Sequence, residues 1–138
     1  MLDLTSLNNA LARLRDSLDR CQDPAYAADP ALVRTIRTAA IKGFEMAYEL
    51  SIRTLRRHLE QADMVAPDAL TYRDLLRLAA ERGLVTDPVA WFRYRDMRTR
   101  SAHTYDEGKS AAIAESIPEF LAAAEDLRAA LERINPCT

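Results

Sequence analysis

Near the start of the chain, apolar residues recur at alternating steps of three and four, at positions 4, 7, 11, 14, 18 and 21. This spacing places all of them on one face of an α-helix, whereas a half-buried strand would alternate at every second residue. A helix with one apolar face needs partner helices against which to bury it. The spacing therefore predicts a first helix that ends before Asp23 and packs inside a helical bundle.

The remainder of the sequence extends this expectation to an all-α fold. Three glycines in 138 residues, few β-branched runs and no useful strand-like alternation favour helices throughout. With 49% hydrophobic residues, residues 1–138 fit a single domain with one core. Further helices are expected over about residues 31–61, from Thr71 to Gly83, from Pro88 onward, and over about residues 110–134 with a kink at Pro118. We expect a four- to five-helix up-and-down bundle that dimerises.

Several classes of protein are disfavoured by composition. Cys21 and Cys137 lie near opposite ends of the chain, which favours neither a disulfide framework nor a metal site, and no cofactor is expected. No signal peptide or membrane-spanning segment is evident, so we expect a soluble, cytoplasmic protein without membrane contact. A net charge of −2 means that any nucleic-acid binding must come from a local basic patch.

The segment from Arg98 to Glu107 carries the side chains best suited to chemistry. It combines the guanidinium of Arg98, the imidazole of His103 and the phenol of Tyr105 within eight residues. His103 can transfer a proton near neutral pH, and Arg98 can hold a phosphate oxygen with two aligned donors. Together they suit metal-independent cleavage of RNA, in which the 2′-hydroxyl attacks the adjacent phosphorus. A metal site built on His103 is the weaker alternative, because no evident ligand set surrounds it.

Helical spacing alone does not bring Arg98 and His103 together. Five residues along an ideal helix correspond to a rotation of about 140°, so the two side chains would not share a face. Either the helix loosens between Thr99 and Ala102, or two chains of a homodimer complete each pocket.

Less specific interpretations remain open for the same residues. The arginines of this region could form an ordinary solvated face paired with Asp96, and His103 could simply interact with a helix end. Tyr105 could lay its ring on the end of the bundle, and His58 is expected at the surface. Trp91, Phe92 and Tyr94 are expected in the core or a dimer contact, not as a base-stacking platform.

Two glutamates on the second expected helix also have two interpretations. Glu45 and Glu49 lie one turn apart, and one of them could orient Arg98 across the core. The four-residue spacing of Glu49 and Arg53 favours a surface ion pair instead.

The pattern Arg-x4-His-x-Tyr at residues 98–105, followed by Asp106 and Glu107, resembles the HEPN domains, and in particular the bacterial nucleotidyltransferase substrate-binding proteins whose toxin members are called HepT. Further resemblance lies in residues 44–50, 55–59 and 72–84 and in Trp91, so that it extends from about residue 5 to residue 133.

This resemblance implies a homodimeric helical bundle that works beside a minimal nucleotidyltransferase. It further implies that Arg98 and His103 form a metal-independent endoribonuclease site acting on RNA, and that the partner, as antitoxin, transfers AMP onto Tyr105. Thr99, Arg100 and Glu49 could support the site. Thr99 departs from the Asn or Asp that the family often has after the motif arginine, which bears on cleavage efficiency. The alternative function is a non-catalytic subunit that presents a nucleotide or substrate to the partner enzyme.

Overall fold

A computed structural model of the protein describes residues 2–66, 68–102 and 107–134. All the regular secondary structure in these residues is helical. Five α-helices and one short 3-10 helix follow one another in the order α1 (Thr5–Cys21), η1 (Pro24–Tyr26), α2 (Pro30–Ala62), α3 (Tyr72–Glu81), α4 (Pro88–Ser101) and α5 (Glu107–Ile134). The prediction of an all-α bundle is therefore confirmed.

Capping side chains define where three of these helices begin. The Asp29 carboxylate accepts hydrogen bonds from the backbone amides at the start of α2, and Asp87 does the same for α4. Thr71 caps α3 through its hydroxyl. Proline follows both aspartates at the first helical position, where its missing N–H costs nothing. These starts lie within a residue or two of those predicted from the sequence.

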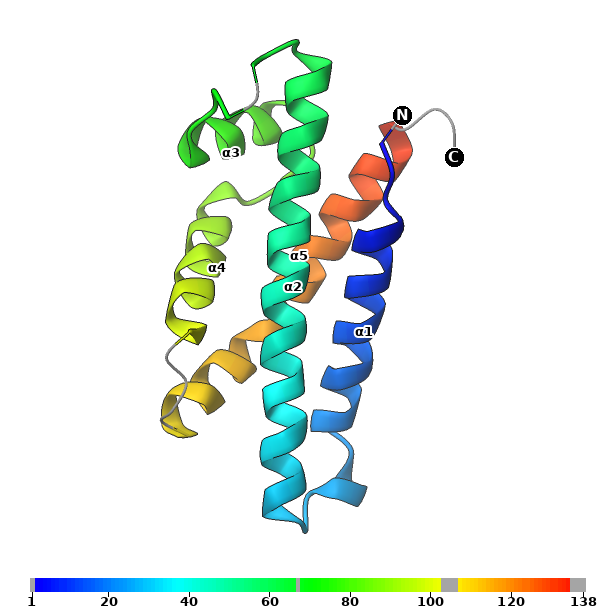
Figure 1. Cartoon of the computed structure of the whole chain (residues 1–138), viewed down its shortest axis with the longest axis vertical. Helices are drawn as coiled ribbons and strands as arrows, with labels where there is room; N and C mark the ends of the chain where they lie inside the picture. Colours follow the sequence, from blue (N-terminus) through cyan, green and yellow to red (C-terminus); the bar gives the residue numbers. More distant parts are fainter. Residues whose placement is uncertain (1, 67, 103–106, 135–138) are drawn as a thin grey trace.

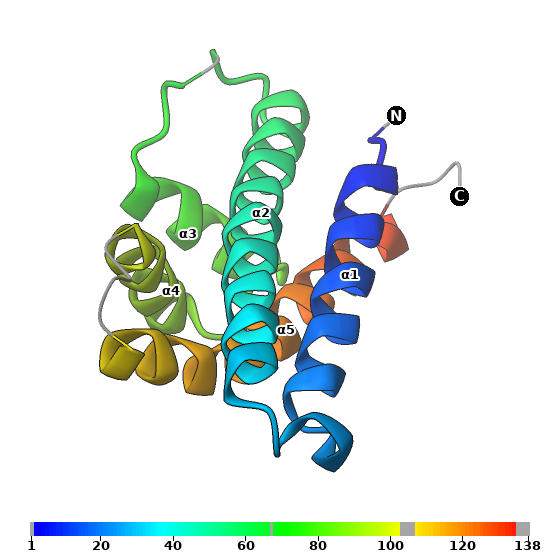
Figure 2. The same cartoon turned by 60° about the horizontal axis from the view of Figure 1, so that its bottom comes forward.

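α2 runs along the length of the molecule and organises the other helices around it (Figure 1). α1 lies along one side of α2, while α3 and α4 lie on the other side (Figure 2). α5 crosses between these two groups and contacts α1, α2 and α4. As a result, α4 and α2 lie close enough for their side chains to meet.

The core is filled by leucines and a cluster of aromatic rings. Phe120 of α5 is fully buried and makes edge-to-face contacts with Phe44, Trp91 and Tyr94, the first at a centroid distance of 4.9 Å. Trp91 and Tyr94 are each only 2% exposed. The expectation that these two aromatic residues pack in the interior is confirmed, and neither offers a free face to a nucleic-acid base.

Three features differ from the expectations or refine them. α5 begins at Glu107, three residues before the predicted position, and continues through Pro118. His58 is half-buried and not at the surface, because it lies on α2 close to Arg82 and Asp63; burial lowers the pKa of its imidazole.

Among the described residues, no helix has the length and apolar character that crossing a bilayer requires.

Candidate functional site around Arg98

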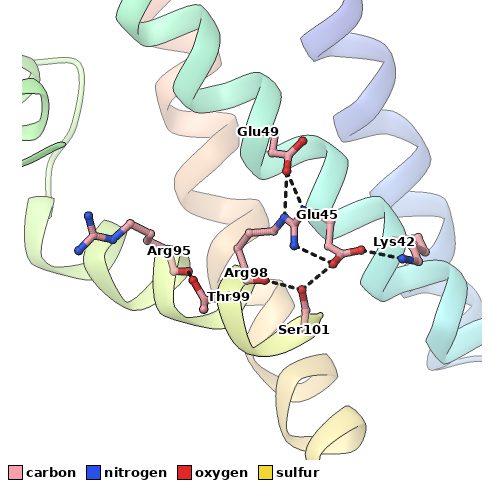
Figure 3. A network of polar contacts seen from close by, with 7 residues as sticks. All are labelled: Lys42, Glu45, Glu49, Arg95, Arg98, Thr99 and Ser101. Carbon is pink, nitrogen blue, oxygen red and sulfur yellow. Dashed lines mark hydrogen bonds and ion pairs between the residues drawn. The ribbon is translucent and has the colours of Figure 1, made fainter. Parts of the chain in front are cut away.

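Arg98 lies in the last turn of α4 and is held by two glutamates of α2 (Figure 3). Its Nε and Nη2 atoms donate to Oε1 of Glu49 at 3.1 and 2.8 Å, and its Nη1 atom donates to Oε2 of Glu45 at 3.0 Å. Because Glu45 and Glu49 are one helical turn apart, both carboxylates face the same neighbour. The guanidinium is thus fixed in place by charge-assisted bonds across the α2 and α4 interface.

Glu45 is the buried centre of this network. The residue is only 8% exposed, and its Oε2 atom also lies 2.7 Å from the hydroxyl of Ser101. Its other oxygen, Oε1, pairs with Lys42 Nζ at 3.2 Å. Ser101 follows Arg98 by three residues, so both side chains project from one face of α4 toward the same carboxylate. We call Lys42, Glu45, Glu49, Arg98 and Ser101 the Arg98 network.

The Arg98 network is electrically balanced, with two cations and two carboxylates. A guanidinium has five N–H donors, and three of those on Arg98 are engaged. One donor on Nη1 and one on Nη2 are left, and the side chain is 31% exposed. Arg98 can therefore offer two donors to an anion, but the network as a whole supplies no net attraction toward it.

His103, Tyr105 and Asp106 lie outside the described residues. α4 ends at Ser101, with Ala102 as its C-cap, and α5 begins at Glu107. Ala102 is thus the last described residue before His103. Residues 99–101 are themselves helical, so α4 does not loosen over them, and the convergence of Arg98 and His103 stays a prediction.

Thr99 and Arg100 do not join the Arg98 network. The Thr99 hydroxyl donates to the Arg95 carbonyl of its own helix at 3.1 Å. Arg100 forms an exposed ion pair with Asp96 one turn away, at 3.2 Å. The interpretation as a solvated, ion-paired face thus holds for Arg100 but not for Arg98, whose partners are on another helix.

The role of Glu49 differs from the one that its spacing favoured. Its carboxylate contacts Arg98 and not Arg53, because α4 packs beside α2 and brings a guanidinium with two aligned donors to it. Sequence analysis missed Lys42 and Ser101 altogether. Their spacings, three residues before Glu45 and three residues after Arg98, were the available signals.

A second polar chain connects α2, α3 and α4 beside the Arg98 network. The Tyr48 hydroxyl donates to the Tyr72 hydroxyl at 3.0 Å, and Tyr72 donates to the Trp91 carbonyl at 2.8 Å. Burial raises the pKa of both phenols, so they stay protonated at neutral pH. The guanidinium of Arg95 covers the Tyr72 ring at 4.4 Å. These contacts fix the position of α4 and leave no titrating group there near neutral pH.

Metal ligands do not gather in the described segments: no three His, Cys, Asp or Glu side chains there are arranged to hold a metal ion. The chemistry available to the described site is therefore that of a positioned guanidinium with two remaining donors.

The sequence and the structure of this chain are both similar to those of known proteins. Residues 2–133 match the family described as nucleotidyltransferase substrate binding protein like. A Haemophilus influenzae protein named probable ribonuclease HepT is 36% identical over 124 aligned residues, and the match covers 87% of this chain and 85% of that protein.

A solved structure from Haemophilus influenzae, described as the fold of a substrate binding domain of a nucleotidyltransferase, superposes with a TM-score of 0.88. It is 33% identical in sequence, and the match covers 94% of this chain and 99% of that one. The resemblance seen in the sequence is thus confirmed, and the chain belongs to the nucleotidyltransferase substrate-binding family.

Proposed function

We propose that this protein is the toxin of a toxin and antitoxin pair and cleaves RNA without a metal, using Arg98 and His103. The observation that carries the proposal is the fixed Arg98 guanidinium at the end of α4, which keeps two donors for an anion immediately before the His103 segment. Homology to a protein named probable ribonuclease HepT supports the same reaction class.

The proposed reaction is an intramolecular transesterification. His103 removes the proton of a ribose 2′-hydroxyl, and the oxygen attacks the adjacent phosphorus. The bond from phosphorus to the 5′-oxygen breaks, and that oxygen takes up a proton from water as it leaves. The products are a 2′,3′-cyclic phosphate and a 5′-hydroxyl. Arg98 would stabilise the additional negative charge on the equatorial oxygens through its two remaining donors.

A cleavage assay with matched arginine variants tests this proposal. Purified wild-type protein should cut RNA in the presence of EDTA, and Arg98→Ala should reduce the rate by about 100-fold or more, as expected for loss of a transition-state donor. Arg100→Ala is the matched control, because Arg100 is two residues away but pairs with exposed Asp96 on its own helix. Equal loss in both variants, or no cleavage by the wild type, would refute the assignment.

Regulation is proposed to occur at Tyr105 through the partner nucleotidyltransferase acting as antitoxin. The phenol oxygen would attack the α-phosphorus of ATP, forming a tyrosyl phosphodiester and releasing pyrophosphate. The AMP group would place a negative charge and considerable bulk beside the site and exclude the RNA phosphate. Mass analysis after incubation with partner and ATP should show AMP on Tyr105 and loss of cleavage. A modified protein that still cleaves RNA would contradict this mode of control.

A homodimer is part of the proposal, since a second chain could contribute to each pocket across a two-fold axis. Sedimentation analysis should give twice the chain mass. In addition, mixing Arg98→Ala chains with His103→Ala chains should restore activity if the pockets are shared. A monomer that retains full activity would remove the dimer from the mechanism.

The alternative function is a non-catalytic subunit that presents a nucleotide or substrate to the partner enzyme. The balanced charge of the Arg98 network favours a role without cleavage, because two carboxylates already neutralise the guanidinium that would otherwise stabilise a reacting phosphate. If expression without the partner impairs growth and His103→Ala abolishes that effect while partner binding is unchanged, the binding-only function is excluded.

A further inference from the structure

An open hollow of about 380 Å³ lies between α1 and α2 and is bordered by Glu49. Its polar lining consists of Ser6, Asn9 and Arg13 from α1 and Glu49 and Arg53 from α2. In α1 these residues follow at steps of three and four, so they share one face of the helix. The hollow is thus built from two adjacent helices of the rigid bundle and not from a loop.

Two arginines of this hollow have no partner among the described residues. Arg13 and Arg53 are both exposed, and within the described residues neither guanidinium makes a hydrogen bond or ion pair. The carboxylate of Glu49, which also borders the hollow, is already engaged by Arg98. The hollow consequently carries two uncompensated positive charges, whereas the Arg98 network beside it carries none.

Glu49 connects the two regions. It contacts Arg98 on one side, and Arg53 follows it by one turn of α2, which is about 6 Å along the helix axis. A polyanion held at Arg98 could therefore continue past Glu49 into the hollow. A guanidinium can donate two parallel hydrogen bonds to the oxygens of one phosphate. The Ser6 hydroxyl and the Asn9 amide add neutral donors nearby.

We propose that the hollow between α1 and α2 binds the phosphate backbone of the RNA strand, with Arg13 and Arg53 as the contact residues. This inference rests on the proposed ribonuclease function and names where the substrate lies beyond the cut site. It also explains how RNA is attracted although the Arg98 network has no net charge. Arg13 and Arg53 attract the phosphate backbone, while Arg98 is held for the reacting phosphate.

A second copy of the chain fits this hollow less well. If a two-fold axis passed through it, Arg13 and Arg53 would face the same arginines of the other copy, which is a like-charge contact. The hollow also contains one strongly exposed apolar side chain, Met46, which is little for a stable interface.

The test measures binding to single-stranded RNA that carries 2′-O-methyl groups and so cannot be cleaved. Fluorescence anisotropy titrations at several salt concentrations compare full-length wild type with R13A/R53A. The control is R73A/R77A, which removes the same charge from exposed positions on α3, on the opposite side of α2 from the hollow. Sedimentation of every variant checks that the oligomeric state is unchanged.

Loss of two phosphate contacts should reduce the slope of log K against log salt by about 1.4, since each contact on a single strand contributes about 0.7. At 0.1 M salt the same contribution corresponds to binding about 25-fold weaker. R73A/R77A should bind like the wild type. An unchanged slope in R13A/R53A, an equal loss in the control, a changed oligomeric state, or no binding by the wild type would overturn the proposal.

Failure of the proposed ribonuclease function can be distinguished from failure of the proposed RNA-binding hollow by comparing RNA cleavage with RNA binding. If the wild type binds RNA through Arg13 and Arg53 but cuts no cleavable RNA, the hollow stands and the ribonuclease assignment falls. If the wild type cuts RNA and R13A/R53A cuts it equally fast below saturation, the assignment stands and the hollow falls.

Discussion

Replacing Glu45 tests whether the Arg98 network is anchored at its buried carboxylate. Glu45→Ala removes the acceptor for Arg98 Nη1 at 3.0 Å and for Ser101 Oγ at 2.7 Å. Hydrogen bonds to charged groups contribute about 1.5 to 3 kcal/mol each. Several features reduce the sum: Arg98 is 31% exposed and keeps Glu49, Ser101 can donate to the Arg98 carbonyl instead, and Lys42 is solvated. We therefore expect a loss of about 2 to 3 kcal/mol in the free energy of unfolding.

Urea denaturation followed by circular dichroism measures this loss. With a slope of about 1 to 3 kcal/mol per molar urea, the midpoint should fall by about 0.7 to 3 M. Glu49→Ala is the matched control, because the Glu49 side chain is 51% exposed; it should cost less than about 1 kcal/mol. Glu45→Gln keeps an acceptor and should lie between them. If Glu49→Ala costs as much as Glu45→Ala, or Glu45→Ala costs less than about 0.5 kcal/mol, the anchoring role is wrong.

Three further variants test the packing and the titration of the bundle. Gly43→Ala should stabilise α2 by up to about 1 kcal/mol in thermal unfolding, since the new methyl would meet Leu14 Cδ1 at 3.4 Å, an ordinary contact; a clear destabilisation would contradict this. Phe120→Ala should cost about 3 to 5 kcal/mol in urea unfolding, because the ring is fully buried, and a cost below about 1 kcal/mol would show that the site collapses freely. Burial lowers the pKa of His58 in the folded protein, and Arg82 adds to this, so the unfolded chain takes up the proton first and stability falls as the pH drops through about 6.5. His58→Gln should show a smaller loss of urea midpoint between pH 7.5 and 5.5 than the wild type, and an equal loss would exclude His58 as a contributor.

Local sequence signals predicted the fold well. The apolar spacing of α1, the N-cap of α3 at Thr71 and the start of α4 at Pro88 depend on interactions within a few residues. Such short-range chemistry can be read from one sequence. The predicted start of α5, at about residue 110, is three residues later than the observed one at Glu107.

The partners of Arg98 could not be predicted in the same way. Glu45 and Glu49 are 53 and 49 residues away in sequence, and only the packing of α4 beside α2 brings them to the guanidinium. Spacing alone favoured Arg53 as the partner of Glu49, since a short-range ion pair is the default on an exposed helix. The motif identified Arg98, His103 and Tyr105, but the charge balance around Arg98 follows only from tertiary contacts.

The most direct measurement of the central claim is the chemistry of the cut ends. Wild-type protein in EDTA should convert RNA to fragments ending in a 2′,3′-cyclic phosphate and a 5′-hydroxyl. A substrate with 2′-deoxyribose at the cut site should stay intact, because it lacks the nucleophile. His103→Ala should abolish cleavage of the all-ribose substrate while leaving the urea midpoint unchanged. Cleavage of the deoxy substrate, ends without a cyclic phosphate, or full activity of His103→Ala would contradict the proposed ribonuclease mechanism.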